Sequence, residues 1–194
     1  DPNPDAREWL ARSFGSIHLC ASVNEVDINP DVVVLCIKPQ IAPKALPTVA
    51  SQFALKPLYL SVMAGIPRTQ LKHWLGDNAR VARSMPNRPA LLRLGVTGLC
   101  REGLIPQDVE LCTRLLTAVG QVVLVESDED IDSVTAVSGS GPAYFFLFIE
   151  ALEKAALTIG LTPEAAKRLV LATAQGSAAM ALSESATPAQ RSEE

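Results

Sequence analysis

The chain has 194 residues, 48% of them hydrophobic, and a formal net charge of −4 at pH 7. This length and composition predict one large or two small globular domains with a sizeable core and exclude an intrinsically disordered chain. The acidic balance gives no reason to expect nucleic acid or an anionic membrane as a partner. With no apolar window long enough for a transmembrane helix and no visible signal peptide, we expect a cytoplasmic protein.

Strand-like and helix-like stretches alternate over the first two thirds of the chain. The predicted helices span residues 4–14, 40–53, 67–75 and 106–119, and the predicted strands span residues 31–38, 58–65, 81–85, 95–100 and 121–125. The run VVVLCI at 32–37 is unbroken, apolar and rich in β-branched residues, which is typical of a parallel strand covered on both faces. We expect 95–100 at the edge of the sheet. The alternation predicts an α/β domain with a largely parallel sheet.

The stretch from Val134 to Glu150, VTAVSGSGPAYFFLFIE, joins this domain to a different kind of sequence. A β-like apolar run stops near two glycines, Gly139 and Gly141, and a strongly apolar helix follows. Glycine tolerates backbone angles closed to other residues, so we expect a tight turn that presents amides and hydroxyls to a small anionic ligand. On its own, the stretch is equally compatible with a turn packed against a neighbouring element.

Two further helices are predicted, at 143–159 and 163–182. The first is apolar on almost every side, and the second is rich in alanine. Helices with so little polar surface must be buried, and a partner subunit accounts for this most simply. Burial within the same chain is the alternative.

Polar residues follow three of the predicted strands. In an open parallel sheet, ligands bind beyond the carboxyl ends of the strands. Lys38 is the cation placed there, suited to a phosphate or a carboxylate, and Asn87 offers both a donor and an acceptor. Asn24, before the first buried strand, is placed to border the same cleft. The four cysteines form no C-x-x-C pair, so we expect buried thiols and no metal site or disulfide.

Four motifs occur in order: VVVLCIKPQ at 32–40, SVMAGI at 61–66, RSMPNRPA at 83–90 and SGSGPAY at 138–144. With these motifs and their spacing, essentially the whole chain resembles the pyrroline-5-carboxylate reductase family. The resemblance implies reduction of 1-pyrroline-5-carboxylate to L-proline with NADPH or NADH, the last step of proline biosynthesis. It also implies a Rossmann-type domain over 1–133, incomplete at its N-terminus, and an all-α dimerisation and substrate domain over 134–194. The implied assembly is a homodimer through the C-terminal helices, or a higher oligomer.

The resemblance also implies functional residues. Those expected to contact the cofactor are Pro2, Asn24, Cys36, Ile37, Lys38, Pro39, Val62, Met63, Ala64 and Asn87. The expected catalytic residues are Asp128, near the nicotinamide, and Thr135 and Ser138, near the substrate. Because the cofactor carries the hydride and the substrate is already an imine, no general base is required. The proton donor and the choice between NAD and NADP stay open.

Several features depart from the family pattern. The family begins with a strand and a G-x-G-x-x-G turn and ends with a loop that holds the substrate carboxylate, and neither is matched between Asp1 and Glu194. We therefore expect a fragment that catalyses poorly alone. Met63 and Arg88 are larger than usual, and Met63 is expected to crowd the cofactor. Two alternatives remain: a non-catalytic oligomerisation module, and a β-hydroxyacid dehydrogenase relative, for which Lys154 lacks the surrounding pattern.

Overall fold

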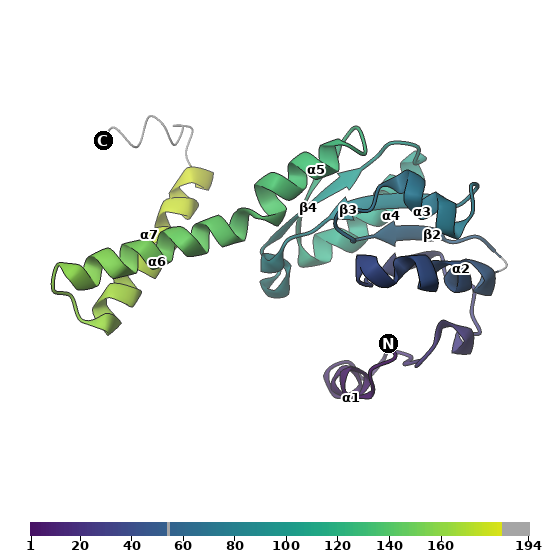
Figure 1. Ribbon diagram of the computed structural model, residues 1–194, viewed down its shortest axis with the longest axis horizontal. Helices are drawn as coiled ribbons and strands as arrows, with labels where there is room; N and C mark the ends of the chain where they lie inside the picture. Colours follow the sequence, from purple (N-terminus) through teal and green to yellow (C-terminus); the bar gives the residue numbers. More distant parts are fainter. Residues whose placement is uncertain (54, 184–194) are drawn as a thin grey trace. The chain divides into compact units, whose positions relative to one another are not determined.

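The computed structural model describes residues 1–53 and 55–183. Contacts between Cα atoms divide the chain after Gly139, into one unit that contains the sheet and a second, helical unit from Ser140 onward (Figure 1). Among the described helices, none has the length and apolar character that crossing a membrane requires.

The first unit is built on a five-stranded sheet in the order β1-β2-β3-β4-β5. The strands are β1 (Val32–Leu35), β2 (Leu58–Ser61), β3 (Arg80–Met85), β4 (Gly95–Cys100) and β5 (Gly120–Val125). Strands β1 to β3 are parallel, β4 is antiparallel to β3, and β5 is parallel to β4. The predicted mostly parallel sheet is confirmed. The edge position predicted for 95–100 is wrong, because β4 lies between β3 and β5.

Helices cover both faces of the sheet, as the apolar strands predict. The covering helices are α2 (Ala42–Gln52), α3 (Arg68–Leu75) and α4 (Pro106–Leu116). A further helix, α1 (Pro4–Ser13), has no buried residue. Short 3-10 turns are η1 (Val23–Glu25), η2 (Pro39–Ile41), η3 (Arg88–Leu92) and η4 (Thr117–Val119). Tyr59 and Val81 pack with Leu71 of α3 on one face. Leu58 and Leu60, their neighbours in β2, pack on the other with α4. This alternation follows from the two-residue period of a strand.

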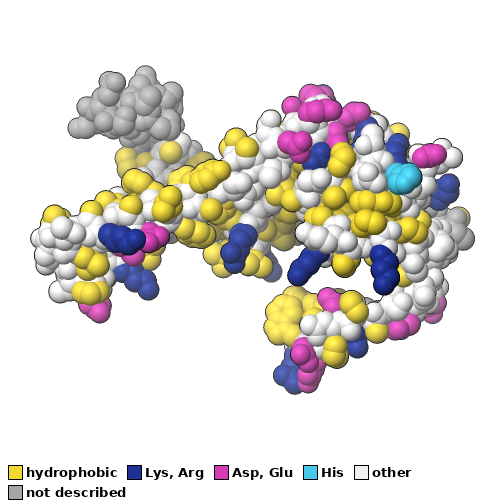
Figure 2. All heavy atoms as spheres, in the orientation of Figure 1, with side chains coloured by type: hydrophobic (Ala, Val, Ile, Leu, Met, Phe, Trp, Pro, Cys, Tyr) yellow, Lys and Arg dark blue, Asp and Glu magenta, His cyan; other side chains and the backbone are white. Residues whose placement is uncertain are grey.

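The second unit is a pair of helices, α6 (Gly141–Thr158) and α7 (Pro163–Ser183). Both were predicted at these positions. Five consecutive residues of α6, from Tyr144 to Phe148, have relative exposures between 62% and 70%. Because successive residues are about 100° apart around a helix, these side chains occupy every side of it. Figure 2 shows hydrophobic side chains along the visible face of this unit.

The junction between the units is helical, which overturns the predicted β-like run and tight turn. Helix α5 (Asp130–Val134) continues into a π-helical turn, η5 (Thr135–Gly139), and α6 follows. Neither Gly139 nor Gly141 has a positive φ. Gly139 instead lies close to β3: a Cβ there would lie 2.8 Å from the Cε of Met85, so the end of that flexible side chain would have to move.

A reciprocal capping box starts this helical segment. The hydroxyl of Ser127 accepts a hydrogen bond from the Asp130 N–H at 3.2 Å, and the Asp130 carboxylate accepts one from the Ser127 N–H at 2.9 Å. The N–H and then the hydroxyl of Ser127 lower the pKa of the Asp130 carboxyl. This S-x-x-D pattern satisfies the first free N–H groups of a helix and explains why residues 130–139 are helical.

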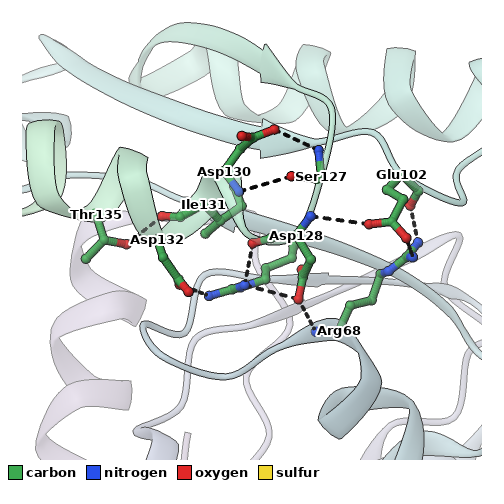
Figure 3. A network of polar contacts seen from close by, with 9 residues as sticks. Arg68, Glu102, Ser127, Asp128, Asp130, Ile131, Asp132 and Thr135 are labelled. Carbon is green, nitrogen blue, oxygen red and sulfur yellow. Dashed lines mark hydrogen bonds and ion pairs between the residues drawn. The ribbon is translucent and has the colours of Figure 1, made fainter.

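Arg83, in the middle of β3, connects this segment to the sheet through a polar network (Figure 3). Its guanidinium contacts the backbone oxygen of Asp128 at 2.8 Å, the Asp128 carboxylate at 3.1 Å and the Asp132 carboxylate at 2.8 Å. The N–H of Arg68 also donates to the Asp128 carboxylate, at 3.0 Å, and the Arg68 guanidinium pairs with Glu102 at 2.6 Å. The network therefore joins the starts of α3 and α5 to the middle of β3.

The cysteines are only partly as expected. Cys100 and Cys112 are buried and free, whereas Cys20 is half-buried and Cys36 is exposed. Burial, with a smaller contribution from Asp108, raises the pKa of Cys112 to about 11. That thiol is therefore protonated at neutral pH and acts as a packing residue.

Gly98 offers a test of how closely α5 packs on the sheet. A Cβ at this position would lie 2.7 Å from both γ-methyl carbons of Val134. We expect Gly98→Ala to lower the free energy of unfolding by about 1–3 kcal/mol through overpacking, measured by urea denaturation. Gly15→Ala is the control, because nothing lies within 4 Å of a Cβ there. Equal stability of the two variants would contradict this packing.

Candidate active site

The carboxyl ends of β1 and β2 lie level with each other, and β3 extends two residues beyond them, to Met85. Leu35 of β1 is paired with Ser61 of β2, and Ser61 with Arg83 of β3. The hydroxyl of Ser84 donates to the Ser61 carbonyl at 2.9 Å, which fixes the two strand ends together. The segments that follow these strands therefore leave the sheet at one edge, where an open parallel sheet binds its ligands.

The segment after β1 presents Cys36 and Lys38 to solvent, and η2 begins at Pro39, directly after them. Lys38 is thus an exposed cation at this edge. Ile37 lines a cleft of about 910 Å³ together with Pro2 and Val23, the neighbour of Asn24. The structure accordingly brings Pro2 to the same cleft as the end of β1.

The segment after β2 differs from the expectation at one residue. Met63 was expected to crowd the cofactor, but its side chain is 2% exposed and packs in the core with Leu71. Its N–H donates to the Ser61 hydroxyl at 3.2 Å, which keeps the turn tight. Ala64 and Gly65 are exposed, and Gly65 has a φ of 71°. At this edge, Met63 therefore offers backbone rather than side-chain atoms.

Asn87, which follows β3, connects two other elements. Its side-chain oxygen accepts a hydrogen bond from the Val96 N–H of β4 at 3.0 Å. Its side-chain nitrogen donates to the carbonyl of Ser138 at 3.2 Å. Two residues predicted for different roles, Asn87 for the cofactor and Ser138 for the substrate, are therefore in direct contact.

The hydroxyls of Thr135 and Ser138 bond back along their own helix. Thr135 donates to the Ile131 carbonyl at 2.8 Å, and Ser138 donates to the Val134 carbonyl at 3.0 Å. Both side chains are half-buried. With the proton so directed, each oxygen keeps its lone pairs available to a donor. The two residues lie about one helical turn apart, so the structure places them together.

Asp128 lies at the other end of this segment. Its carboxylate is held by Arg83 and by the N–H of Arg68. The helix from Asp130 to Ser138 rises by about 12 Å, which separates Asp128 from Ser138 along it. Thr135 lies nearer to Ser138 than to Asp128 along the same helix.

Sequence reasoning missed Arg83, the residue that holds this segment. Its side chain is only 3% exposed, and its acidic partners are 45 and 49 residues away in the sequence. The available signal was an arginine inside a strand predicted to be buried, since a buried charge requires partners. Within residues 1–53 and 55–183, no three histidine, cysteine or acidic residues are grouped as a metal site would require.

Known proteins resemble this chain closely. A family model described as "Pyrroline-5-carboxylate reductase dimerisation" matches residues 128–194. The pyrroline-5-carboxylate reductase of Pseudomonas aeruginosa is 42% identical over 191 residues, which cover 98% of this chain and 70% of the relative. The corresponding Escherichia coli enzyme is 34% identical over 182 residues, covering 93% of this chain and 67% of the relative. For a Bacillus subtilis relative, 35% identical over 174 residues, the covered shares are 89% and 62%.

Solved structures agree. A pyrroline-5-carboxylate reductase from Coxiella burnetii superposes with a TM-score of 0.91 and 34% identity, covering 100% of this chain and 72% of that one. A Plasmodium falciparum pyrroline carboxylate reductase with NADP bound gives a TM-score of 0.81 and 29% identity, covering 90% and 66%. The chain therefore spans about two thirds of the length of these relatives, and it belongs to the pyrroline-5-carboxylate reductase family.

Proposed function

We propose that the complete protein reduces 1-pyrroline-5-carboxylate to L-proline with NADPH or NADH, the last step of proline biosynthesis. The observation that carries this proposal is 42% identity to a pyrroline-5-carboxylate reductase over 98% of the chain. The paired strand ends and the nearby Ser138 support it. They place an edge suited to a dinucleotide and a residue suited to substrate contact in the same unit.

The carboxyl edge of β1 and β2 fits a dinucleotide. The exposed Lys38 supplies a cation for phosphate, and the exposed backbone at Ala64 and Gly65 allows close approach. We propose that the cofactor is held by Pro2, Asn24, Cys36, Ile37, Lys38, Pro39, Val62, Met63, Ala64 and Asn87. When bound, the nicotinamide supplies the hydride that reduces the imine.

For the substrate we propose a wall formed by Thr135 and Ser138. Their hydroxyl oxygens accept from a protonated imine nitrogen or, by turning, donate to the substrate carboxylate. Both hydroxyls already lie on a helix fixed to the sheet, so they cost little reorganisation when a substrate binds. We propose that Asp128 lies near the nicotinamide, where its carboxylate also holds the start of the helix through Arg83.

The match to the dimerisation model supports homo-oligomerisation. We propose further that two copies meet through α6 and α7, because α6 exposes the apolar residues from Tyr144 to Phe148 on every side. In this assignment, residues 1–133 bind the cofactor and residues 134–194 supply dimerisation and substrate contacts. The division after Gly139 and the family match from residue 128 lie on either side of that boundary.

The activity is tested directly with the complete protein. We expect oxidation of NADPH or NADH, followed at 340 nm, when 1-pyrroline-5-carboxylate is added, with L-proline as the product. Short β-hydroxyacids with the oxidised cofactors form the comparison set. A protein that dimerises but oxidises neither cofactor would support the alternative of a non-catalytic oligomerisation module, and turnover of β-hydroxyacids alone would support the dehydrogenase alternative.

Lys38→Ala tests the cofactor edge. We expect the KM for NADPH to rise about tenfold, which corresponds to the loss of one charge-assisted contact, while the KM for pyrroline-5-carboxylate stays the same. Lys56→Ala is the matched control, since this exposed lysine precedes the amino end of β2, at the other end of the strand. An equal effect of both substitutions would show only a general change in charge.

Ser138→Ala tests the substrate wall. We expect the KM for pyrroline-5-carboxylate to rise about five- to tenfold through the loss of one hydroxyl contact, with little change in the KM for NADPH. Ser133→Ala, an exposed serine of α5, serves as the control. Unchanged steady-state constants for Ser138→Ala would remove this hydroxyl from the proposed site.

A further inference from the structure

We propose that Arg83 and Asn87 are positioning residues that clamp the segment 128–138 at its two ends and so set where Thr135 and Ser138 lie. The inference rests on the proposed function, because Ser138 is the substrate wall in that proposal. It assigns Asn87 a role within the chain itself, beyond the cofactor contact that its place after β3 suggests.

The first attachment is at the start of α5. The Arg83 guanidinium reaches three acceptors there: the Asp128 carbonyl, the Asp128 carboxylate and the Asp132 carboxylate, all within 3.1 Å. The Arg83 side chain is 3% exposed. A charge so deeply buried is strongly destabilising without partners, so the start of α5 is held where these acceptors meet Arg83.

The second attachment is at the end of η5. The Asn87 carboxamide uses its oxygen for the Val96 N–H of β4 and its nitrogen for the Ser138 carbonyl. A carboxamide offers a donor and an acceptor on one rigid group, which a carboxylate or a hydroxyl does not reproduce in this geometry. Asn87 therefore ties the Ser138 backbone to β4.

The two attachments match in spacing and direction. Arg83 and Asn87 are four residues apart along β3 and its extension, which corresponds to about 13 Å of extended chain. The helical part of the segment 128–138, residues 130–138, rises by about 12 Å. It thus runs alongside β3, with its start at Arg83 and its end at Asn87.

Side-chain packing between the attachments fixes the rotation of the segment. Gly98 leaves room for the branched Val134 side chain, and a Cβ there would lie 2.7 Å from both of its γ-methyl carbons. Rotation of the helix about its axis would therefore bring Val134 against β4 or break one of the two attachments. The directions of the Thr135 and Ser138 hydroxyls are fixed together with the helix that carries them.

The test uses the complete protein and two clamp variants. Asn87→Asp keeps the acceptor for Val96 but removes the donor to Ser138, and Arg83→Lys keeps the charge but loses the forked guanidinium. Arg80→Lys is the matched control, because Arg80 is also on β3 and binds a carboxylate at 2.7 Å, that of Asp108 on α4. Asp132→Asn, at a carboxylate that is 72% exposed, replaces Arg83→Lys if that variant does not fold.

Two measurements are made on each variant: amide hydrogen–deuterium exchange over 128–139, and steady-state kinetics. We expect the clamp variants to exchange faster over 128–139 and to show a KM for pyrroline-5-carboxylate about fivefold higher or more. For Arg83→Lys, which lies outside the proposed cofactor contacts, we expect the KM for NADPH to stay within about twofold of that of the unsubstituted protein. We expect Arg80→Lys to change neither the exchange over 128–139 nor the KM for pyrroline-5-carboxylate.

Unchanged hydrogen–deuterium exchange over 128–139 in the clamp variants would overturn the inference. Faster exchange with an unaltered KM for pyrroline-5-carboxylate would also overturn it. The same increase in exchange for Arg80→Lys would show general destabilisation and also overturn it. If the unsubstituted protein does not reduce pyrroline-5-carboxylate, the proposed function fails, and the exchange measurement still decides whether the clamp exists.

Discussion

The arrangement of the candidate site beside this sheet depends on the interactions of the buried Arg83 guanidinium. Removing a charge from water costs several kcal/mol, and hydrogen-bonded partners offset this cost only in good geometry. Arg83 finds its partners in Asp128 and Asp132, neither of which is near it in the sequence. Since such networks often add little net stability compared with apolar packing, the main effect of Arg83 is to specify one placement of α5.

That placement extends along the chain to the functional residues. The Ser127–Asp130 capping box begins the helix, and the helix continues without a break into the π-helical turn 135–139. Single π-helical turns are uncommon and often occur at functional sites, because they redirect the residues that follow. Here the turn ends with the Ser138 carbonyl directed at Asn87 and with Gly139 against Met85.

The elements with a clear period were predictable, and those defined by distant contacts were not. The run 32–35 is apolar and β-branched, which identifies β1 without further context. The place of β4 depends on its pairing with β3, which no local pattern encodes.

In SGSGPAY, glycine and serine suit a turn, yet they also suit a helix that packs closely on another element. The S-x-x-D pattern at 127–130 was the local signal for a helix. The sequence was enough to predict that the segments after the strands lie together at one edge of the sheet. The contacts of Arg83 and Asn87 could be identified only from the fold.

The exposed faces of α6 complete the physical argument. A helix with aromatic and aliphatic side chains on every side cannot be covered by α7 alone, because one neighbouring helix covers only one side. In the proposed assembly, a second copy of the chain would supply matching apolar surface, and the match of residues 128–194 to the dimerisation model supports homo-oligomerisation. Helix α6 begins three residues after Ser138, so the backbone that carries the proposed substrate wall continues directly into the helix that needs this cover. The proposed substrate wall, held at its start by Arg83 and at its end by Asn87, is therefore linked through Ser140 to the helix that we propose meets a second copy.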